Sequence, residues 1–512
     1  MTLARLLELA ALRWPEAEAV VDGGRRLTYA ALHARARTLG AAFQQLGVLR
    51  GDRVLIALRN RLEHVLAYWA LQLVGGVPVP VNFRFVAGEM QYVLGDSGAR
   101  VVLFESDTAA AVAGAAPASS VRLVFVGDRT AAQLGALPFD DLAGATPAGE
   151  PAENDISLIL YTSGTTGRPK GVPRTHRNHY AGAVAQAMQC GYAPGERMLG
   201  VMPLYHTMGI HALTSMAAVN GCFVCQPEWS ARQALGLIQA ERISALYLIP
   251  TLFYDLVHAP ECTREAVESV TKLAYAGAPM LATLTEACVK AFGPQAFVNH
   301  YGSTEIYTVS VRPDVHRKPG CAGRPGLHSA LRVVAASTER RVGPDEVVPA
   351  GEKGEIIASL ASPEAFAGYW NRPDADAKAL REGWYFTGDM GHLDADGELH
   401  VAGRVDDMII SGGENIHPVE VEEVLARHPH VADVAAIGEP DERWGQKVVA
   451  FVVPAAPGLT AEALDAHCRA SADLAAFKRP RRVVFVRAIP KTASGKILRR
   501  LLRDGQYSEI TS

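Results

Sequence analysis

The stretch "LYTSGTTGRPKGV" at residues 160–172 places glycines, hydroxyl side chains and a lysine together, directly after an apolar run. Gly164 and Gly167 allow backbone N–H groups to approach an anion closely, and Lys170 adds a positive charge. The combination predicts a phosphate-binding loop. It differs from the P-loop pattern, because the glycines are too close together and Lys170 is followed by Gly171 rather than by Ser or Thr. A glycine-rich turn between a strand and a helix is the alternative interpretation.

The length and composition indicate a globular protein of more than one packed unit. With 512 residues, of which 49% are hydrophobic and 20% charged, the chain exceeds the usual size of one domain. Its formal net charge of -4 at pH 7 gives no reason to expect nucleic acid. No stretch approaches the roughly 20 uninterrupted apolar residues that a membrane span needs. The opening residues, with Glu8, Arg13 and Glu16 among leucines, predict an amphipathic surface helix rather than an export signal.

The cysteine content indicates a reducing compartment. Seven cysteines, an odd number in a long chain, suit free thiols and therefore a cytoplasmic location. Cys222 and Cys225 form a CxxC pair in "NGCFVCQPEW", but neither a second pair nor a histidine lies nearby in the sequence. We interpret this pair as part of a buried strand, and metal or redox chemistry is the alternative.

The spacing of apolar residues predicts an α/β fold. Between residues 155 and about 305, short apolar runs alternate with helical spacing such as that of "SARQALGLIQAER". An earlier round of the same pattern covers residues 1–130, which predicts two related α/β lobes. The apolar runs span residues 53–58, 100–105, 156–162, 197–204, 222–226, 243–250, 272–278 and 296–302.

The remainder of the chain changes pattern twice. Residues 325–402 contain short strands with turns, which predicts a small β-rich subdomain. After them, the pattern predicts a compact α+β domain of roughly 100 residues. We place the boundary between Arg404 and Asp407, which divides the chain into an N-terminal domain, residues 1–405, and a C-terminal domain, residues 406–512. The expected C-terminal elements are helices at 419–429 and 461–470 and strands at 431–438, 447–454 and 481–490.

Four further motifs follow the loop along the chain. "YGSTE" at 301–305 brings an aromatic ring, a glycine, two hydroxyls and a carboxylate to the end of an apolar strand. The others are "WYFTGD" at 384–389, "GRVDDMIISGGENIHPVEVE" at 403–422 and "PKTASGKILRR" at 490–500. Each one alone could be an ordinary turn, and Asp389 and Arg404 could merely form a surface pair. Their joint occurrence in this order points to one shared function.

Together these motifs resemble the acyl-adenylate-forming superfamily, which includes acyl-CoA synthetases, nonribosomal-peptide adenylation domains and firefly-type luciferases. The resemblance spans nearly the whole chain, and "YTSGTTGRPKG", "YGSTE", "GRVDDMIISGGENI" and "PKTASGK" are its most specific parts. It implies a large N-terminal domain followed by a mobile C-terminal one. It also implies that a carboxylic acid reacts with ATP to give acyl-AMP and pyrophosphate, after which the acyl group passes to the thiol of CoA.

The resemblance implies roles in ATP binding for the motif residues. The loop and Lys170 would hold the phosphates, and Tyr301 would stack on adenine. Asp389 would accept the ribose hydroxyls, and Arg404 would support the ribose or a phosphate. The full implied set is Thr162, Ser163, Gly164, Thr165, Thr166, Gly167, Lys170, Gly277, Ala278, Tyr301, Gly302, Ser303, Thr304, Asp389 and Arg404.

The resemblance also implies catalytic roles. Lys496 would contact the acid and the α-phosphate during adenylation, and a solvated lysine in a basic tail with Arg499 and Arg500 is the alternative. Mg²⁺ would bridge the phosphates with help from Thr165 and Glu305, and would neutralise the charge that moves to the pyrophosphate.

In the C-terminal domain, the resemblance implies a change of face between two half-reactions. Asp406 stands at the implied hinge, and Gly412 and Gly413 would leave room for a pantetheine arm. The positions that bind the CoA nucleotide in aryl-CoA ligases are matched here by Trp444, Arg479 and Arg481. For the two arginines, ordinary surface charge is the alternative interpretation.

The acyl pocket is implied by the same comparison. His206 in "MPLYHTMGI" would gate the pocket and the entry of the thiol, and a structural histidine is the alternative. "PLYH", "DERWGQ" and "LAAFKRP" most resemble aryl-CoA ligases of the 4-chlorobenzoate type, which implies a benzoate-like acid. The implied lining is Ala183, His206, Thr207, Met208, Tyr247, Ala276, His300, Gly302, Tyr307 and Thr308.

The pocket departs from that type in ways that bear on the substrate. His300 stands where the aryl-CoA ligases have an aliphatic residue, and Tyr307 and Thr308 add hydroxyls, which favours a polar substituent such as a phenolic hydroxyl. A medium-chain, branched or cyclic aliphatic acid is the alternative substrate. A separate carrier protein in place of CoA, a luciferase-like oxygenase and a non-catalytic scaffold are the rival functions. The expected partners are the acid, ATP and CoA, and a homodimer is an open alternative to a monomer.

Overall fold

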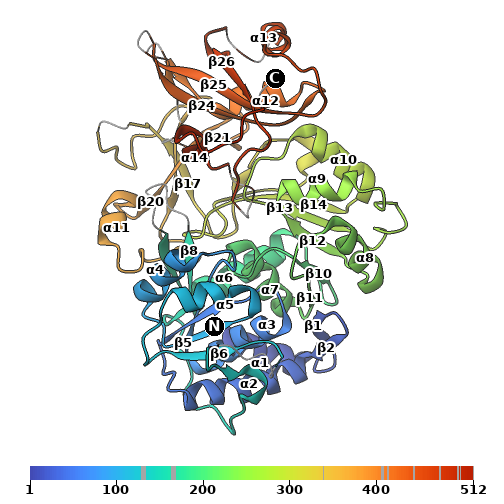
Figure 1. The fold of residues 1–512 in the computed structure, drawn as a ribbon, viewed down its shortest axis with the longest axis vertical. Helices are drawn as coiled ribbons and strands as arrows, with labels where there is room; N and C mark the ends of the chain where they lie inside the picture. Colours follow the sequence, from blue (N-terminus) through green and yellow to red (C-terminus); the bar gives the residue numbers. More distant parts are fainter. Residues whose placement is uncertain are drawn as a thin grey trace.

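The computed structural model describes residues 1–128, 134–162, 169–337, 340–404, 407, 409–411, 414–441, 444–471, 474, 476–492, 495 and 497–510. Figure 1 shows a large body formed by the N-terminal part of the chain, with the C-terminal residues gathered at one end. The predicted mixed α/β fold, with a large N-terminal domain and a small C-terminal domain, is confirmed. No helix in these described ranges is both long enough and apolar enough to cross a membrane.

The largest sheet forms the core of the N-terminal domain. Its strand order is β16-β15-β14-β13-β12-β10-β11-β1-β2, and the strands from β14 to β1 are parallel. The strands are β1 (Glu18–Asp22), β2 (Arg25–Thr28), β10 (Arg197–Gly200), β11 (Cys222–Cys225), β12 (Ala245–Leu248), β13 (Lys272–Tyr275), β14 (Ala296–Tyr301), β15 (Ser310–Arg312) and β16 (Arg324–Pro325).

The helices that cover this sheet form two groups, and each packs within itself. One group is α8 (Ala231–Glu241), α9 (Pro250–His258) and α10 (Ala282–Phe292), and the other includes α1 (Leu3–Arg13), α6 (His176–Gln189) and α7 (Thr207–Val219). As expected of an amphipathic helix, α1 buries Leu3, Leu6, Leu7 and Ala10 while Leu12 stays exposed.

A second, parallel sheet has the strand order β4-β3-β5-β6-β7. Its elements are β3 (Arg53–Ala57), β4 (Val77–Pro80), β5 (Val101–Phe104), β6 (Arg122–Phe125), β7 (Leu137–Pro138), α2 (Tyr29–Gln45), α3 (Leu62–Val74), α4 (Ala87–Ser97), α5 (Ser106–Gly114) and the 3₁₀ turn η2 (Phe139–Asp141). Helix α3 contacts both β1 of the large sheet and β4 of this one. A helix between two sheets has little surface toward water, which explains why "LEHVLAYWALQLV" is apolar on nearly every side.

Two pairs of strands correct the expected division into lobes. β1 and β2 lie within residues 1–130, but β1 pairs with β11 and both strands therefore belong to the large sheet. β8 (Ile156–Thr162), expected in that sheet, instead forms a two-stranded sheet with β9 (Lys170–Thr175) and lies against β4. An apolar run identifies a strand, but the partner of that strand depends on long-range packing that a local pattern does not contain.

The expected β-rich subdomain and the smaller α+β domain are both present. The subdomain sheet contains β17 (Leu331–Val334), β18 (Gly354–Ser359), β19 (Leu380–Arg381), β20 (Trp384–Leu393) and β21 (Leu399–Arg404), with η3 (Val315–Arg317) and α11 (Pro373–Ala379) nearby in sequence. The C-terminal elements are β22 (Ile409–Ser411), β23 (Glu414–Ile416), α12 (Pro418–Ala426), β24 (Val431–Asp441), β25 (Gly445–Pro454), α13 (Ala461–Ala470), η5 (Ala476–Lys478), β26 (Arg482–Phe485) and α14 (Arg499–Arg503). The change from one sheet to the next occurs between Arg404 and Ile409.

The cysteines are free thiols, and most are buried. Cys222 and Cys225 lie in β11, whose residues are all buried between the helix layers. Burial raises the pKa of Cys222 to about 12, which keeps its thiol protonated and unreactive. This placement agrees with the interpretation of the pair as part of a core strand.

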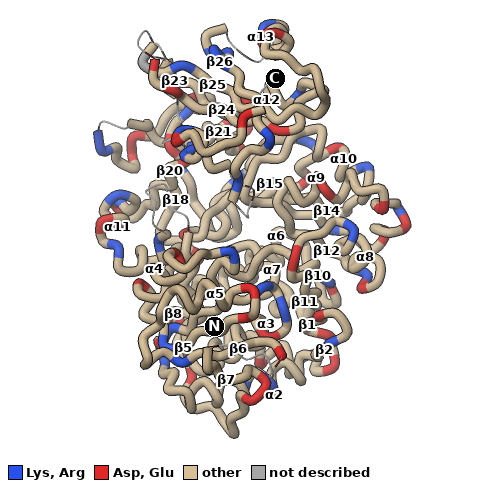
Figure 2. Tube along the Cα trace, in the orientation of Figure 1, with Lys and Arg blue, Asp and Glu red and all other residues tan. Residues whose placement is uncertain are grey.

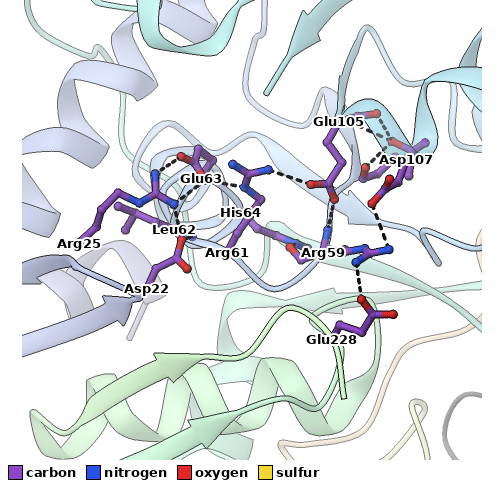
Figure 3. Close-up of polar contacts among 12 residues, drawn as sticks. Asp22, Arg25, Arg59, Arg61, Leu62, Glu63, His64, Glu105, Asp107 and Glu228 are labelled. Atoms are coloured by element: carbon purple, nitrogen blue, oxygen red, sulfur yellow. Dashed lines mark hydrogen bonds and ion pairs between the residues drawn. The ribbon is translucent and has the colours of Figure 1, made fainter. Parts of the chain in front are cut away.

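An ionic network joins the large sheet and the second sheet at the start of α3 (Figure 3). Arg61 donates to Glu63 at 2.7 Å and to Glu105 at 2.8 Å, and Glu63 also pairs with Arg25 of β2. Glu63 and Glu105 are each 7% exposed, so these contacts replace water around buried carboxylates. Burial raises the pKa of Glu63, but the hydrogen bonds from Arg25 and Arg61 outweigh it and lower the pKa overall. Figure 3 also shows Asp22, Arg59, Asp107 and Glu228 as members of this network.

Replacing Arg61 by alanine is expected to lower the free energy of unfolding by about 3 kcal/mol, because Glu63 and Glu105 would remain buried without that partner. Urea unfolding followed by circular dichroism measures the change. The exposed Arg232, which pairs with Glu261 at 2.8 Å, provides a matched control whose alanine variant should lose less than about 1 kcal/mol. Equal losses in the two variants would contradict the prediction.

The effect of Arg61→Ala should also depend on pH. The pKa of Glu63 is lower in the folded protein than its ordinary value of 4.5, so its ion pairs stabilise the fold above that pH. That contribution disappears as the pH falls through the folded pKa. The difference in unfolding free energy between wild type and Arg61→Ala should therefore narrow below about pH 4.5.

Candidate active site

Strands β8 and β9 form an antiparallel hairpin that holds both ends of the predicted phosphate loop. Their register pairs Thr162 with Lys170, and the Thr162 hydroxyl donates to the Lys170 carbonyl oxygen at 3.5 Å. The predicted loop residues 163–167 lie between these two positions, outside the described residues. The hairpin thus brings the two described ATP-site residues of this motif together.

The lysine of the loop and the carboxylate of "YGSTE" meet at one tyrosine. The Lys170 ammonium lies 4.1 Å from the centre of the Tyr369 ring, and the Tyr369 hydroxyl donates to Oε1 of Glu305 at 2.7 Å. Glu305 is 6% exposed. Burial lowers the pKa of Lys170, and the opposing charge of Glu305 counteracts part of that shift. The arrangement places one cation and one carboxylate in the same partly dehydrated region.

A fully buried arginine fixes the position of this region. Arg174 of β9 is 0% exposed, and its Nη1 donates to the carbonyl oxygens of Thr304 at 3.1 Å and Glu305 at 2.6 Å. Its Nη2 donates to the carbonyl oxygen of Glu364, and its guanidinium carbon lies 3.9 Å from the centre of the Tyr307 ring. One side chain therefore connects the strand after the phosphate loop to two other segments.

The segment after β14 is a tight turn that leaves no space for a larger residue at its first position. A Cβ atom on Gly302 would lie 2.0 Å from the carbonyl oxygen of Tyr307. The Ser303 N–H donates to the carbonyl oxygen of Ile306 at 2.9 Å, which closes the turn. The hydroxyls of Thr304 and Thr207 are 3.0 Å apart, so the turn also contacts the first residue of α7.

Tyr301, Asp389 and Arg404 form a second polar group, as their predicted shared role requires. The Tyr301 hydroxyl donates to Oδ2 of Asp389 at 2.8 Å, and Nη1 of Arg404 lies 2.9 Å from Oδ1 of the same carboxylate. Asp389 and Arg404 are direct partners in the register of β20 and β21. Burial, and next the charge of Asp389, raise the pKa of Tyr301 well above its ordinary value, so its hydroxyl remains a donor.

Gly277 and Ala278 follow β13 at the same sheet edge where Tyr301 ends β14. The register of the two strands pairs Tyr275 with Asn299, which sets both turns at one level. Gly277 has a φ of 85°, a left-handed conformation that favours glycine over a residue with a Cβ. Gly277 is exposed and Ala278 is partly exposed, so this turn borders the surface.

The predicted acyl-pocket residues gather between the large sheet and the layer of α6 and α7. The registers of β12, β13 and β14 place Tyr247, Ala276 and His300 on one face of the sheet. The Tyr247 and His300 rings are 5.8 Å apart. Ala183 of α6 and Met208 of α7 are 0% and 2% exposed, respectively.

Tyr307 and Thr308 continue this group from the segment after β14. The Tyr307 ring contacts Arg174 on one side, and the His211 ring of α7 approaches it edge-on with centres 3.7 Å apart. The Thr308 N–H donates to Oε2 of Glu364 at 3.2 Å, and Thr308 is buried. Both residues therefore lie in the interior, and their roles as pocket walls stay a prediction.

His206 precedes α7 and caps its first turn. Its Nδ1 accepts from the N–H of Met208 at 3.3 Å, which leaves the ring proton on Nε2 in the neutral form. Burial lowers the pKa of His206 to about 4, so the imidazole is neutral at pH 7. A neutral Nε2–H is a hydrogen-bond donor without a net charge.

The predicted CoA residues divide into two groups. The Arg481 guanidinium lies 5.9 Å from the centre of the Trp444 ring, so these two residues lie together. Arg479 instead donates to Oδ1 of Asp465 at 2.9 Å and to the carbonyl oxygen of Ala476 at 3.2 Å. The remaining predictions for this part of the chain, at Asp406, Gly412, Gly413 and Lys496, lie outside the described residues.

Two residues that shape this region, Arg174 and Tyr369, were not predicted from the sequence. Arg174 had only a weak signal, its position four residues after Lys170 in the segment "KGVPRT". Tyr369 had none, because it is distant in sequence from both Lys170 and Glu305. Its contacts depend on how the β-rich subdomain packs on the hairpin.

Comparison with known proteins gives matches along nearly the whole chain. Residues 7–370 match the AMP-binding enzyme family, and residues 420–496 match the AMP-binding enzyme C-terminal domain. A 4-chlorobenzoate–CoA ligase of Arthrobacter sp. is 34% identical over 515 residues, covering 98% of this chain and 95% of that protein. A feruloyl-CoA synthase of Amycolatopsis sp. is 37% identical over 491 residues, 95% of each chain. A long-chain-fatty-acid–CoA ligase of Mycobacterium tuberculosis is 32% identical over 492 residues, 94% of this chain and 93% of that one.

Replacing Arg174 by leucine is expected to lower the free energy of unfolding by about 3–5 kcal/mol, because the carbonyl groups of Thr304, Glu305 and Glu364 would lose their cationic partner. Arg177, an exposed arginine in the first turn of α6, is the matched control. Its leucine variant should change stability by less than about 0.5 kcal/mol. Urea unfolding measures both, and a small loss in Arg174→Leu would show that this contact network is not a constraint on the fold.

Proposed function

The chain belongs to the AMP-binding enzyme family and is an AMP-forming acid–thiol ligase, and we propose that its acid is aromatic and benzoate-like and its thiol is that of CoA. The observation that carries the assignment of the site is the convergence of Lys170 and Glu305 on Tyr369. It brings the loop motif and "YGSTE" together at one place. The similarity to ligases named for aromatic acids supports the choice of acid.

The phosphates of ATP would bind at the hairpin loop and Lys170. A carboxylate is a weak nucleophile toward an anionic triphosphate, so the site must neutralise the charge that moves to the leaving pyrophosphate. The partly buried ammonium of Lys170 would act strongly there, because few waters screen its charge. Glu305 offers a buried carboxylate beside Lys170, an oxygen ligand of the kind that Mg²⁺ prefers, and Thr165 would assist. When bound, Mg²⁺ supplies further neutralisation of the phosphate charge.

The nucleoside would bind at Tyr301, Asp389 and Arg404. The Tyr301 hydroxyl and Arg404 orient the Asp389 carboxylate, which retains lone pairs for the ribose hydroxyls. The face of the Tyr301 ring would stack on adenine, with the Gly277 turn on its other side. His206 would present its Nε2–H to the acid and to the incoming thiol.

Thioester formation would follow a rotation of the C-terminal domain about Asp406. We divide the chain accordingly into residues 1–405 and 406–512. Trp444 and Arg481 would bind the CoA nucleotide as a pair. Arg479 contributes less to this proposal, because Asp465 already pairs with it. Free thiols and the use of ATP and CoA fit a cytoplasmic enzyme.

Lys496→Ala tests the division between half-reactions. The variant is expected to lose acid-dependent pyrophosphate release by at least about 100-fold, since the charge at the α-phosphate is missing from the transition state. It should still form thioester from supplied acyl-AMP and CoA. Lys290→Ala, at an exposed position of α10, is the control and should support both reactions. Loss of both half-reactions in Lys496→Ala would contradict the assigned role.

The acid is identified by measuring AMP and pyrophosphate release from ATP with benzoates, phenylpropenoates, cyclohexanecarboxylate and C2 to C12 fatty acids, each with and without CoA. A strong CoA-dependent signal for a benzoate supports the proposal. A signal confined to fatty acids favours the second candidate, an aliphatic acyl-CoA synthetase, which the similarity to a long-chain-fatty-acid ligase supports. Pyrophosphate without thioester would indicate a carrier protein as the acceptor.

His300→Ile is expected to change the choice among benzoates. Isoleucine restores an aliphatic wall, so the ratio of kcat/KM should shift from hydroxylated toward halogenated or unsubstituted benzoates by about tenfold or more. Steady-state pyrophosphate release measures the ratio. Unchanged ratios would show that His300 does not contact the ring substituent.

A further inference from the structure

The histidine of the proposed acyl pocket belongs to a buried chain of polar side chains at the end of α6. Nε2 of His300 lies 3.3 Å from Sγ of Cys190, and Nε2 of Gln186 donates to the same sulfur at 3.5 Å. These three residues are 3%, 2% and 0% exposed, respectively. The chain is therefore shielded from water.

The contacts admit an arrangement in which the Gln186 amide uses one sulfur lone pair of Cys190 and the thiol hydrogen bonds to Nε2 of His300. Burial raises the pKa of Cys190 to about 12 and lowers the pKa of His300 to about 4, so the thiol keeps its hydrogen and the imidazole is neutral. With Nε2 as the acceptor, the ring hydrogen of His300 is on Nδ1.

In this arrangement, the Nδ1–H of His300 is a buried donor with no partner among the described residues. Leaving a buried polar group unpaired costs free energy, and such a group in a native protein calls for a partner. His300 shares its sheet face with Tyr247 and Ala276, the face that we assign to the acyl group. An atom of the acyl group on that face would supply the partner.

We propose that Gln186 and Cys190 position the Nδ1–H of His300 as a donor, so that the enzyme selects acids whose acyl group carries an oxygen acceptor. This inference rests on the proposed function, because it assumes that His300 faces the acyl group. A phenol or aryl-ether oxygen can accept a hydrogen bond from this Nδ1–H. An alkyl, halogen or amino substituent of the same size does not, since none offers a comparable acceptor.

Pairs of acids with matched shape test the selectivity. We would measure kcat/KM for pyrophosphate release with methoxybenzoate against ethylbenzoate, and with hydroxybenzoate against methylbenzoate and aminobenzoate, each substituted at ring position 3 or 4. The oxygen-bearing member of each pair should be preferred by about tenfold or more, since a site built to hydrogen-bond rejects a substrate that cannot. Equal values, or a preference for the amino or ethyl compound, would overturn the inference.

Variants of Cys190 separate positioning from packing. Cys190→Ala removes the donor to Nε2 and should reduce the methoxy-to-ethyl ratio several-fold, while kcat/KM for ethylbenzoate changes little. Cys190→Ser keeps a donor and should retain the ratio. Cys288→Ala, at a buried position in α10, is the control and should also retain it. An unchanged ratio in Cys190→Ala would show that the thiol does not orient His300.

The same measurement distinguishes failure of the inference from failure of the proposed aromatic substrate. If wild type activates aliphatic acids but no benzoate, the aromatic proposal fails, and 7-methoxyheptanoate against nonanoate then provides the matched pair. Preference for the ether supports the positioned donor, and equal use of both overturns it. Absence of pyrophosphate release with every acid would overturn both proposals.

Discussion

The buried guanidinium of Arg174 is the interaction on which the rest of the site depends. A charge inside a protein is tolerated only when partners replace its hydration, and the planar fork of arginine supplies several donors in fixed directions. Here the partners are the carbonyl groups of Thr304, Glu305 and Glu364, together with the Tyr307 ring. The strand that follows the predicted phosphate-binding loop is thereby attached to the segment that carries Glu305.

The rest of the site follows from strand ends. Tyr301 ends β14, and Gly277 and His206 follow β13 and β10, so these three proposed ligand contacts stand at one edge of the large sheet. Lys170 begins β9 of the separate hairpin. Ligands of open α/β sheets bind outside the carboxyl ends of the strands, where loops can be varied without disturbing the core. The β-rich subdomain completes the site by contributing Asp389, Arg404 and the nearby Tyr369.

The same region contains polar groups in states that cost stability. Burial lowers the pKa of Lys170, and it keeps the imidazoles of His206 and His300 neutral. Groups perturbed in this way concentrate at functional sites, because a ligand can supply the interaction that the folded protein lacks. The ionic network at α3 differs, since each of its buried carboxylates already has an arginine. The buried polar groups of the proposed site are thus available to a ligand, whereas the ionic network at α3 joins two sheets.

Local pattern was sufficient for much of this protein. Strands at 53–58, 272–278 and 431–438 and the helix at 461–470 were predicted from apolar spacing, because periodicity reports which residues face a core. Motif resemblance placed Tyr301, Asp389 and Arg404 in one site, and their hydrogen bonds and register agree with that grouping. Local pattern could not place β1 beside β11 or separate β8 from the large sheet, since strand pairing depends on contacts between residues far apart in the sequence.

The sequence by itself therefore determined the elements, the family motifs and the class of reaction, all of which depend on residues near one another in the chain. The tertiary structure decided the contacts between distant segments. Only packing of the whole chain brought Tyr369 into contact with Lys170 and Glu305. It also formed the ion pair between Arg479 and Asp465 and the contact between Cys190 and His300. Such contacts are selected by burial and by the need to pair every buried polar group, and these conditions exist only once the whole chain has folded.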